Sequence, residues 1–303
     1  MKQLKIFITG ASSFLGLHVL NHLQGKGYDV YALRHAAPLP KTHHFNAVDA
    51  DLEESGSIAL AAKGIYPDVV LHIAALAQTE LCEKEPERAR RINVDATSEL
   101  LKLFSSESTR FIYVSTDLVF DGLKGNYNES DTPNPLMVYA RTKFEAEELV
   151  KAWGKNHAII RVALLYGPAL GRKQSFAGWI ESSLEKGKAT LFKDEFRTPL
   201  YVEDAANALV RLIDSNFCGV MHLGGADRCS RYEFGVELAR QGGYELSNIC
   251  SANIKDAQLN YYRPPDVSLD SSLAKKNLGI VPISIKEGIG RYLQYSGKRG
   301  FSK

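Results

Sequence analysis

Short apolar runs alternate with amphipathic segments along the first half of the chain. Runs rich in strand-forming residues stand at 4–9, 29–33, 69–73, 111–114 and 158–162. Apolar positions recur at helical spacing between them, for example at Leu17, Leu20 and Leu23. Short, wholly apolar runs that alternate with helices are typical of strands buried in a parallel sheet. The pattern predicts an α/β fold built on a doubly wound parallel sheet of the Rossmann type.

The regular alternation ends after Gly167-Pro168. Beyond this point, helical spacing appears around 176–184, 202–213, 232–240 and 285–293, with short strands between. We therefore predict two parts: a dinucleotide-binding Rossmann domain in residues 1–165 and a smaller mixed α/β substrate-binding lobe in residues 166–303. Late segments of the lobe are expected to return to the first domain.

A glycine turn follows the first predicted strand and leads directly into a helical pattern. Its spacing is G-x-x-S-x-x-G, with Gly10 and Gly16 at the ends and Ser13 in the middle. Gly10 would permit the sharp turn, and Gly16 would let the helix pack closely on the strand. The free N–H groups at the helix start would face a pyrophosphate. A simple turn in an α/β protein is the alternative interpretation.

The second predicted strand ends at Arg34-His35, without an acidic residue. An acid at this place suits the ribose 2′-hydroxyl of NAD, whereas an arginine suits the 2′-phosphate of NADP. This favours NADP(H), with NAD(H) as the second choice and a solvated surface charge as the alternative for Arg34. Asp51 and Leu52 follow a third short segment and are expected to line the adenine site.

Tyr139 and Lys143 are four residues apart on a predicted helix, so both side chains lie on one face. A free tyrosine titrates near pH ~10, and a neighbouring ammonium lowers that value. Thr116, at the end of an earlier predicted strand, could hold the oxygen that receives the proton. These three residues predict carbonyl reduction or alcohol oxidation beside a hydride carrier. The alternative is an exposed lysine beside a half-buried tyrosine.

Composition is that of an ordinary globular protein: 303 residues, 45% hydrophobic, 24% charged and a net charge of +2. This balance, with no basic run, argues against a nucleic-acid partner. No segment predicts a membrane span or a signal sequence. The four cysteines show no metal-ligand spacing, so we expect reduced thiols, no metal site and a cytoplasmic protein. His72 lies in an apolar run and is expected to be a core residue.

Several motifs together carry a family resemblance. The run Ser115-Thr116-Asp117-Leu118-Val119-Phe120-Asp121-Gly122 is the most specific of them. Residues 67–75, 134–143 and 263–270 match further segments of the same family. Over essentially its whole length, the chain resembles the extended short-chain dehydrogenases/reductases, and among them the dTDP-4-dehydrorhamnose reductase group.

The resemblance implies NADP(H)-dependent reduction of the C4 keto group of a nucleotide-linked deoxysugar. Tyr139 would be the acid, Lys143 would lower its pKa and bind the nicotinamide ribose, and Thr116 would hydrogen-bond the carbonyl. Asp117 would contact the sugar. The resemblance also allows a homodimer. The cofactor contacts predicted from motif and resemblance together are Gly10, Ser12, Ser13, Phe14, Leu15, Gly16, Arg34, Asp51, Leu52, Ala74, Ala75, Leu76, Val114, Tyr139 and Lys143.

Two positions depart from the group on the substrate side. Leu164 stands where an aromatic residue is common, and Arg197 stands where the group has glycine. Arg197 and Arg263 could each bind a diphosphate in bidentate fashion, with a surface ion pair as the alternative for each. The sugar therefore stays open. So do two other functions: an NAD-dependent epimerase or dehydratase, and a non-catalytic subunit like the regulatory subunit of methionine adenosyltransferase.

Overall fold

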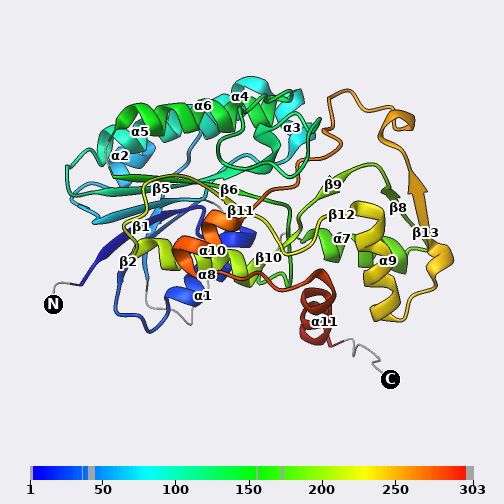
Figure 1. Ribbon diagram of the computed structural model, residues 1–303. Helices are drawn as coiled ribbons and strands as arrows, with labels where there is room; N and C mark the ends of the chain where they lie inside the picture. Colours follow the sequence, from blue (N-terminus) through cyan, green and yellow to red (C-terminus); the bar gives the residue numbers. More distant parts are fainter. Residues whose placement is uncertain (1–2, 36, 40–44, 155, 172–173, 298–303) are drawn as a thin grey trace.

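A computed structural model describes residues 3–35, 37–39, 45–154, 156–171 and 174–297, and its centre is a parallel sheet (Figure 1). Within these residues the sheet has seven strands in the order β11-β6-β5-β4-β1-β2-β3. Their bounds are β1 Lys5–Thr9, β2 Asp29–Arg34, β3 Asn46–Asp49, β4 Val69–His72, β5 Arg110–Thr116, β6 His157–Val162 and β11 Gly219–Leu223. The chain runs outward from β1 to β3 and resumes with β4 on the other side of β1. This reversal marks the crevice where doubly wound sheets bind ligands.

Helices cover both faces of the sheet (Figure 1). One face carries α1 Phe14–Leu23, α8 Val202–Ile213 and α10 Ser272–Leu278, and the other carries α2 Ser57–Ala61, α5 Ala96–Leu103 and α6 Val138–Trp153. Side chains alternate between the two cores, because Ile6 and Ile8 of β1 enter the first and Phe7 enters the second. The predicted Rossmann α/β fold is confirmed.

The helical segment between β4 and β5 is not one continuous helix. The segment is divided into α4 Pro86–Arg90, a π-helical turn Arg91–Asp95 and α5, and α3 Thr79–Lys84 precedes it. The π turn directs the buried Asn93 side chain to two other elements: it accepts from the Leu76 N–H at 2.8 Å and donates to Thr142 Oγ1 at 3.0 Å. The loop after β4 is thereby held against α6, which carries Tyr139 and Lys143.

A smaller lobe lies beside the sheet (Figure 1). Its core is formed by α7 Phe176–Glu185, α9 Arg231–Gly242 and α11 Ile285–Tyr295, around buried Tyr166 and Phe234. Three pairs of short strands accompany them: β7 Leu165–Tyr166 with β10 Leu200–Tyr201, β8 Ala189–Phe192 with β13 Ile249–Ala252, and β9 Phe196–Arg197 with β12 Cys229–Ser230. Short helical turns lie at Asp117–Val119, directly after β5, and at Leu246–Asn248 and Ile254–Asp256.

Three elements that come late in the chain belong to the sheet and its helical layers. They are β11, α8 and α10.

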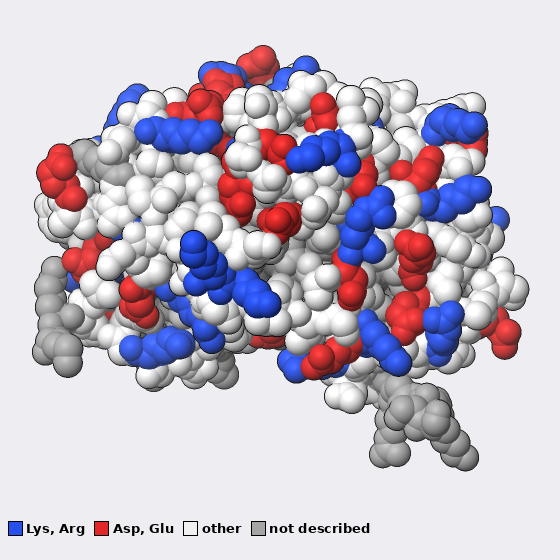
Figure 2. Space-filling model, viewed as in Figure 1, with Lys and Arg blue, Asp and Glu red and all other residues white. Residues whose placement is uncertain are grey.

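The surface mixes both signs of charge. Lys and Arg side chains are interspersed with Asp and Glu on the face in Figure 2, without a large area of one sign. None of the helices in the described ranges combines the length and the apolarity needed to cross a membrane. All four cysteines are free thiols, and only Cys82 is buried.

Candidate active site

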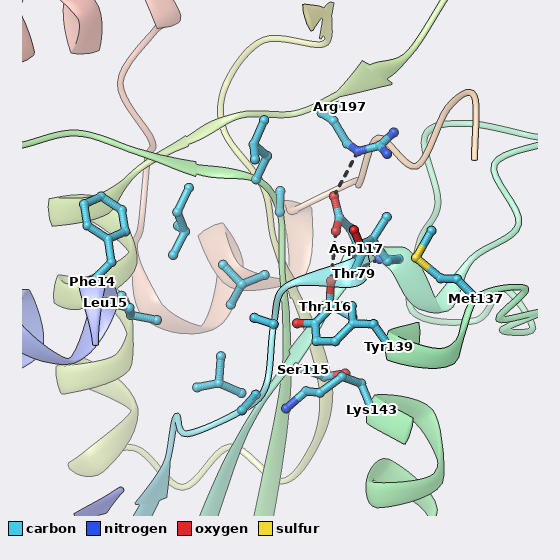
Figure 3. Close-up of a pocket in the computed structure, with 18 of the residues that line it drawn as sticks. Phe14, Leu15, Thr79, Ser115, Thr116, Asp117, Met137, Tyr139, Lys143 and Arg197 are labelled. Atoms are coloured by element: carbon cyan, nitrogen blue, oxygen red, sulfur yellow. Dashed lines mark hydrogen bonds and ion pairs between the residues drawn. The ribbon is translucent and has the colours of Figure 1, made fainter. Parts of the chain in front are cut away.

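Thr116, Tyr139 and Lys143 meet at the carboxyl end of β5 (Figure 3). Every residue of β5 is buried, and its last residue, Thr116, accepts a hydrogen bond from the Leu118 N–H at 3.3 Å. Tyr139 and Lys143 lie one turn apart on the buried face of α6. Both side chains point toward the same side, where Phe14 and Leu15 lie across the cavity. Sequence spacing and sheet topology thus bring the predicted triad together.

These residues line a cavity of about 370 Å³, here called the substrate cavity. Ser13, Phe14 and Leu15 line it at the start of α1, and Ala75 and Val114 line it along the strand ends. The lobe contributes four charged side chains to the lining: Glu195, Arg197, Arg231 and Arg263. A volume of this size is typical of a small-molecule site. Eight of the predicted contacts lie outside its lining: Gly10, Ser12, Gly16, Arg34, Asp51, Leu52, Ala74 and Leu76.

The glycine turn is closely packed at the reversal of strand order. Gly10 has φ +68°, and a Cβ there would lie 2.7 Å from the Ala74 nitrogen. A Cβ on Gly16 would lie 2.1 Å from the Gly10 carbonyl oxygen. Ser13 caps α1, since its Oγ accepts from the Gly16 N–H at 3.0 Å while its own O–H can still donate. The turn, the cap and the helix start fit a dinucleotide pyrophosphate.

The other predicted cofactor residues hold the strand ends in place. The Ala74 N–H donates to Thr9 Oγ1 at 3.1 Å. Arg34 forms an ion pair with Asp49 of β3, and His35 lies 3.3 Å from Asp51. Leu52 packs against the sheet core on the α2 side. The carboxylate that the second strand lacks is therefore supplied by its neighbour β3, at a position that sequence reading did not consider.

Burial dominates the protonation of the triad. It raises the pKa of Tyr139 above its ordinary value of 10.0, and the interaction with Thr116 only partly opposes this rise. Burial also lowers the pKa of Lys143 to about 7, against a smaller opposing effect of Glu147. The Lys143 Nζ lies 4.1 Å from the centre of the Tyr113 ring. The net effect at Tyr139 is therefore a raised pKa, opposite in direction to the lowering expected from Lys143.

Sequence reading missed the buried network beneath Lys143. Glu147 lies one turn further along α6, and its carboxylate accepts from Arg161 Nη2 at 2.7 Å and from Ser115 Oγ at 2.5 Å. Both Glu147 and Arg161 are almost fully buried. The sequence does hold a sign of Glu147: it stands four residues after Lys143 and so lies on the same face of α6 as Tyr139 and Lys143. His72 is a core residue as expected, bonded to Thr9 and Thr97.

Asp117 is a buried carboxylate that faces the cavity. Its Oδ1 accepts from the Thr116 hydroxyl at 3.1 Å, and its Oδ2 has no hydrogen-bond partner among the described residues. Burial raises the pKa of Asp117 to about 6, although Arg197, at 3.9 Å, opposes the rise. A buried acceptor without a hydrogen bond favours a ligand that carries a hydroxyl donor.

One buried carboxylate, Glu195, binds three guanidinium groups. Its Oε1 lies 2.8 Å from Arg197 Nη2 and 2.7 Å from Arg231 Nε, and its Oε2 accepts from Arg263 Nε at 2.5 Å. The two contacts to Oε1 are ion pairs without hydrogen-bond alignment. Burial raises the pKa of Glu195, but the three arginines outweigh it and hold the value at about 2. We call these four residues the Glu195 cluster.

The cluster revises the interpretation of two predicted residues. Arg197 is only 3% exposed, so the surface ion pair is wrong for this residue, and Arg263 is mostly buried as well. Both arginines bind Glu195, which sequence reading missed together with Arg231. An acidic residue two positions before Arg197 was the available signal. With three cations against one carboxylate, the cluster favours an anionic ligand.

An aromatic cavity of about 370 Å³ adjoins the Glu195 cluster. It shares Arg231 and Arg263 with the substrate cavity and is otherwise lined mainly by Phe176, Trp179 and Phe192. Phe176 and Trp179 are stacked, with an interplanar angle of 11°. Aromatic surfaces beside guanidinium groups fit a planar base joined to phosphate. Among the described residues, no group of three or more His, Cys, Asp or Glu side chains is arranged to hold a metal ion.

Comparison with known families identifies the chain's group. The family described as RmlD substrate binding domain matches residues 4–297. The chain belongs to this family. The match covers almost the whole chain, including the glycine turn and the residues Thr116, Tyr139 and Lys143.

Proteins similar to this chain carry names of two different kinds. The spore coat polysaccharide biosynthesis protein SpsK of Bacillus subtilis is 30% identical, over 96% of this chain and 97% of its own. Methionine adenosyltransferase 2 subunit beta of Bos taurus is 28% identical, over 95% of this chain and 88% of its own. Sequence similarity alone therefore leaves both a biosynthetic and a subunit function open.

Solved structures repeat the fold. The dTDP-4-dehydrorhamnose reductase of Bacillus anthracis, in complex with NADP, has a TM-score of 0.84 at 23% identity, covering 97% of this chain and 100% of its own. MoeE5, in complex with UDP-glucose and NAD, has a TM-score of 0.81 at 25% identity, covering 97% and 98%. The central sheet and the smaller lobe are common to these proteins.

Proposed function

We propose that this protein is an NADP(H)-preferring reductase that acts on the C4 keto group of a nucleotide-linked deoxysugar. The observation that carries the proposal is the meeting of Thr116, Tyr139 and Lys143 in one cavity between a glycine turn and an arginine cluster. The turn suits a dinucleotide, the triad suits proton delivery and the arginines suit a diphosphate. The membership of the chain in the RmlD family supports this assignment.

The chain's own residues supply the proton and the orientation. When bound, the reduced nicotinamide supplies the hydride for C4. Tyr139 donates its hydroxyl proton to the carbonyl oxygen, so the ketone becomes an alcohol. The Thr116 hydroxyl, now bonded to Asp117, turns to donate to the same oxygen. A high pKa keeps Tyr139 protonated until hydride transfer makes the substrate oxygen more basic.

Lys143 and the glycine turn would hold the cofactor. Lys143 would bind ribose hydroxyls beside Tyr139, and the start of α1 would hold the pyrophosphate. Structural neighbours crystallised with NADP and with NAD support a nicotinamide cofactor, without distinguishing the two. The preference for NADP(H) rests on Arg34.

The lobe would hold the nucleotide diphosphate. Arg231 and Arg263 line both cavities, so a diphosphate bound to them can connect a sugar in the substrate cavity to a base in the aromatic cavity. Fork-shaped guanidinium groups suit phosphate oxygens. Asp117, whose Oδ2 makes no hydrogen bond among the described residues, would accept from a sugar hydroxyl. MoeE5 with UDP-glucose supports a nucleotide sugar in this fold.

An epimerase or dehydratase is the nearest rival within the fold. Dehydration needs an acid/base pair beside the catalytic threonine, and Asp117 provides one carboxylate there. The second carboxylate in the cavity, Glu195, is bound by three arginines and held charged, so it is a poor proton donor. This arrangement favours reduction. NAD⁺ that co-purifies tightly with the protein would instead favour the epimerase.

The similarity to methionine adenosyltransferase 2 subunit beta supports a second candidate function, that of a regulatory subunit. A regulatory subunit would bind a catalytic partner in fixed ratio and change its kinetics. The test is to mix the purified protein with a methionine adenosyltransferase catalytic subunit and to measure complex formation and rate. Binding with a changed rate, together with no reductase turnover, would favour this function.

Isotope transfer tests the proposed reaction directly. The purified protein is given nicotinamide cofactor carrying deuterium at the transferable C4 position, with a panel of dTDP- and UDP-linked 4-keto-6-deoxysugars. The proposal predicts deuterium at C4 of the product sugar for at least one member, detected by mass spectrometry. Cofactor binding without deuterium transfer to any member would contradict it.

A further inference from the structure

Arg34 and Asp49 form a bidentate ion pair at the edge of the predicted cofactor site. They are register partners at the ends of β2 and β3. Arg34 Nε donates to Asp49 Oδ1 at 2.7 Å and its Nη2 donates to Oδ2 at 3.3 Å. The carboxylate thus occupies two N–H groups of the guanidinium, the same fork that a phosphate would use.

The pair lies beside the glycine turn. The Ala11 N–H donates to the Leu33 carbonyl at 3.3 Å, so the turn is bonded to the residue before Arg34. A second pair, His35 with Asp51 at 3.3 Å, follows on the same strand ends. Two carboxylates therefore stand against two basic side chains where the adenosine ribose is expected. The local charge is much less positive than Arg34 alone suggests.

Resting on the nicotinamide cofactor of the proposed function, we propose that Asp49 is a specificity-determining residue that competes with the 2′-phosphate of NADP(H) for Arg34. A 2′-phosphate must displace the carboxylate from Arg34 and also tolerate its charge nearby. The hydrogen bond from Arg34 lowers the pKa of Asp49, so the carboxylate is charged at neutral pH. Asp49 therefore weakens the preference for NADP(H) that Arg34 provides.

The 2′-phosphate can displace Asp49 from Arg34, because this ion pair is exposed to solvent and therefore weak. The Asp49 side chain is 66% exposed, and exposed ion pairs are weak and screened by salt. A dianionic phosphate can therefore replace the carboxylate at Arg34. NADH carries no 2′-phosphate and does not need Arg34 to be released. Asp49 consequently affects the two cofactors differently.

Calorimetric titration of NADPH and NADH into the full chain tests this proposal. The readout is the ratio of the NADH dissociation constant to the NADPH dissociation constant. Asp49→Asn should raise this ratio by about three- to tenfold, and Arg34→Gln should lower it by a similar factor. Glu145→Gln, which removes a comparable exposed pair with Arg90, is the matched control and should leave the ratio unchanged.

The outcomes separate this proposal from the proposed function. If both cofactors bind but Asp49→Asn leaves the ratio within twofold of the wild type, Asp49 does not compete and the proposal is overturned. A ratio that falls in Asp49→Asn overturns it as well. If the wild-type protein binds neither NADPH nor NADH, the result contradicts the proposed reductase function itself and, with it, the role of Asp49. Circular dichroism of each variant confirms that it is folded.

Discussion

Arg197 lies with its Nη2 2.8 Å from Glu195 Oε1, and both side chains are buried. The two residues stand two positions apart in the chain, on and just before the short strand β9. The family resemblance leads to the expectation of glycine at position 197, and the charge of Arg197 is balanced by Glu195. The substitution is therefore accommodated by a carboxylate that also organises Arg231 and Arg263.

Glu195→Gln should destabilise the protein by about 2–5 kcal/mol. The amide would leave one buried and two mostly buried guanidinium groups without their common carboxylate. Chemical denaturation measures the free energy of unfolding, with the exposed Glu148→Gln as control. Inorganic pyrophosphate should raise the melting temperature of Glu195→Gln more than that of the wild type. Equal effects on the two proteins would show that the cluster does not attract anions.

Lys143→Met should stabilise the protein while abolishing turnover. Burial lowers the pKa of Lys143 to about 7 from 10.5, so the folded protein disfavours the proton that the unfolded chain holds. The cost to stability is therefore full below pH 7 and is relieved as the pH rises from 7 to 10.5. We expect a gain of about 1–4 kcal/mol at pH 6 that shrinks by pH 10.

Unfolding curves across this pH range measure the gain, and the exposed Lys102→Met serves as control. A gain that does not depend on pH would indicate better apolar packing instead of removal of a buried charge. A loss of stability at every pH would show that Lys143 supports the fold, against our account.

Glu203→Gln should make the protein less sensitive to acid. Glu203 of α8 accepts from His18 Nδ1 at 2.5 Å and from His22 Nε2 at 2.6 Å, which joins α8 to α1. Burial raises the pKa of Glu203, but the two histidines outweigh it and lower the value from 4.5 to about 2. Its stabilising effect is therefore present above pH 4.5 and lost as the pH falls toward 2.

The stability difference between wild type and Glu203→Gln should accordingly be present at pH 5 and should shrink between pH 5 and pH 2. Acid titration followed by circular dichroism measures it. The exposed Glu54→Gln is the control and should follow the wild type. A difference that stays constant through this range would show that the carboxylate charge is not what binds α1 to α8.

Local patterns were enough to predict the sheet and the triad. The strands, the Gly10 turn and the Tyr139–Lys143 spacing each lie within a short stretch of sequence, and parallel topology brings their carboxyl ends together. The π turn at Asn93 was not predictable, because it depends on contacts to Leu76 and Thr142 that are distant in the chain. Periodicity alone gives no sign of one extra residue in a helical turn.

Electrostatic partners were the hardest part to predict. Asp49 meets Arg34 through strand pairing, and Arg231 meets Glu195 through the fold of the lobe. In each case the partner is set by tertiary packing and not by spacing. The direction of the Tyr139 pKa also depends on tertiary packing, since burial raises it and Thr116 only partly opposes the rise.

The central claim is that Tyr139 delivers a proton to a substrate carbonyl. The most direct measurement is the rate of NADPH consumption with dTDP-4-keto-L-rhamnose by wild type and Tyr139→Phe, with cofactor affinity determined for both. We predict turnover by the wild type and a rate about 10²–10⁴-fold lower in Tyr139→Phe, at nearly unchanged affinity for NADPH. Equal rates in the two proteins would contradict the account.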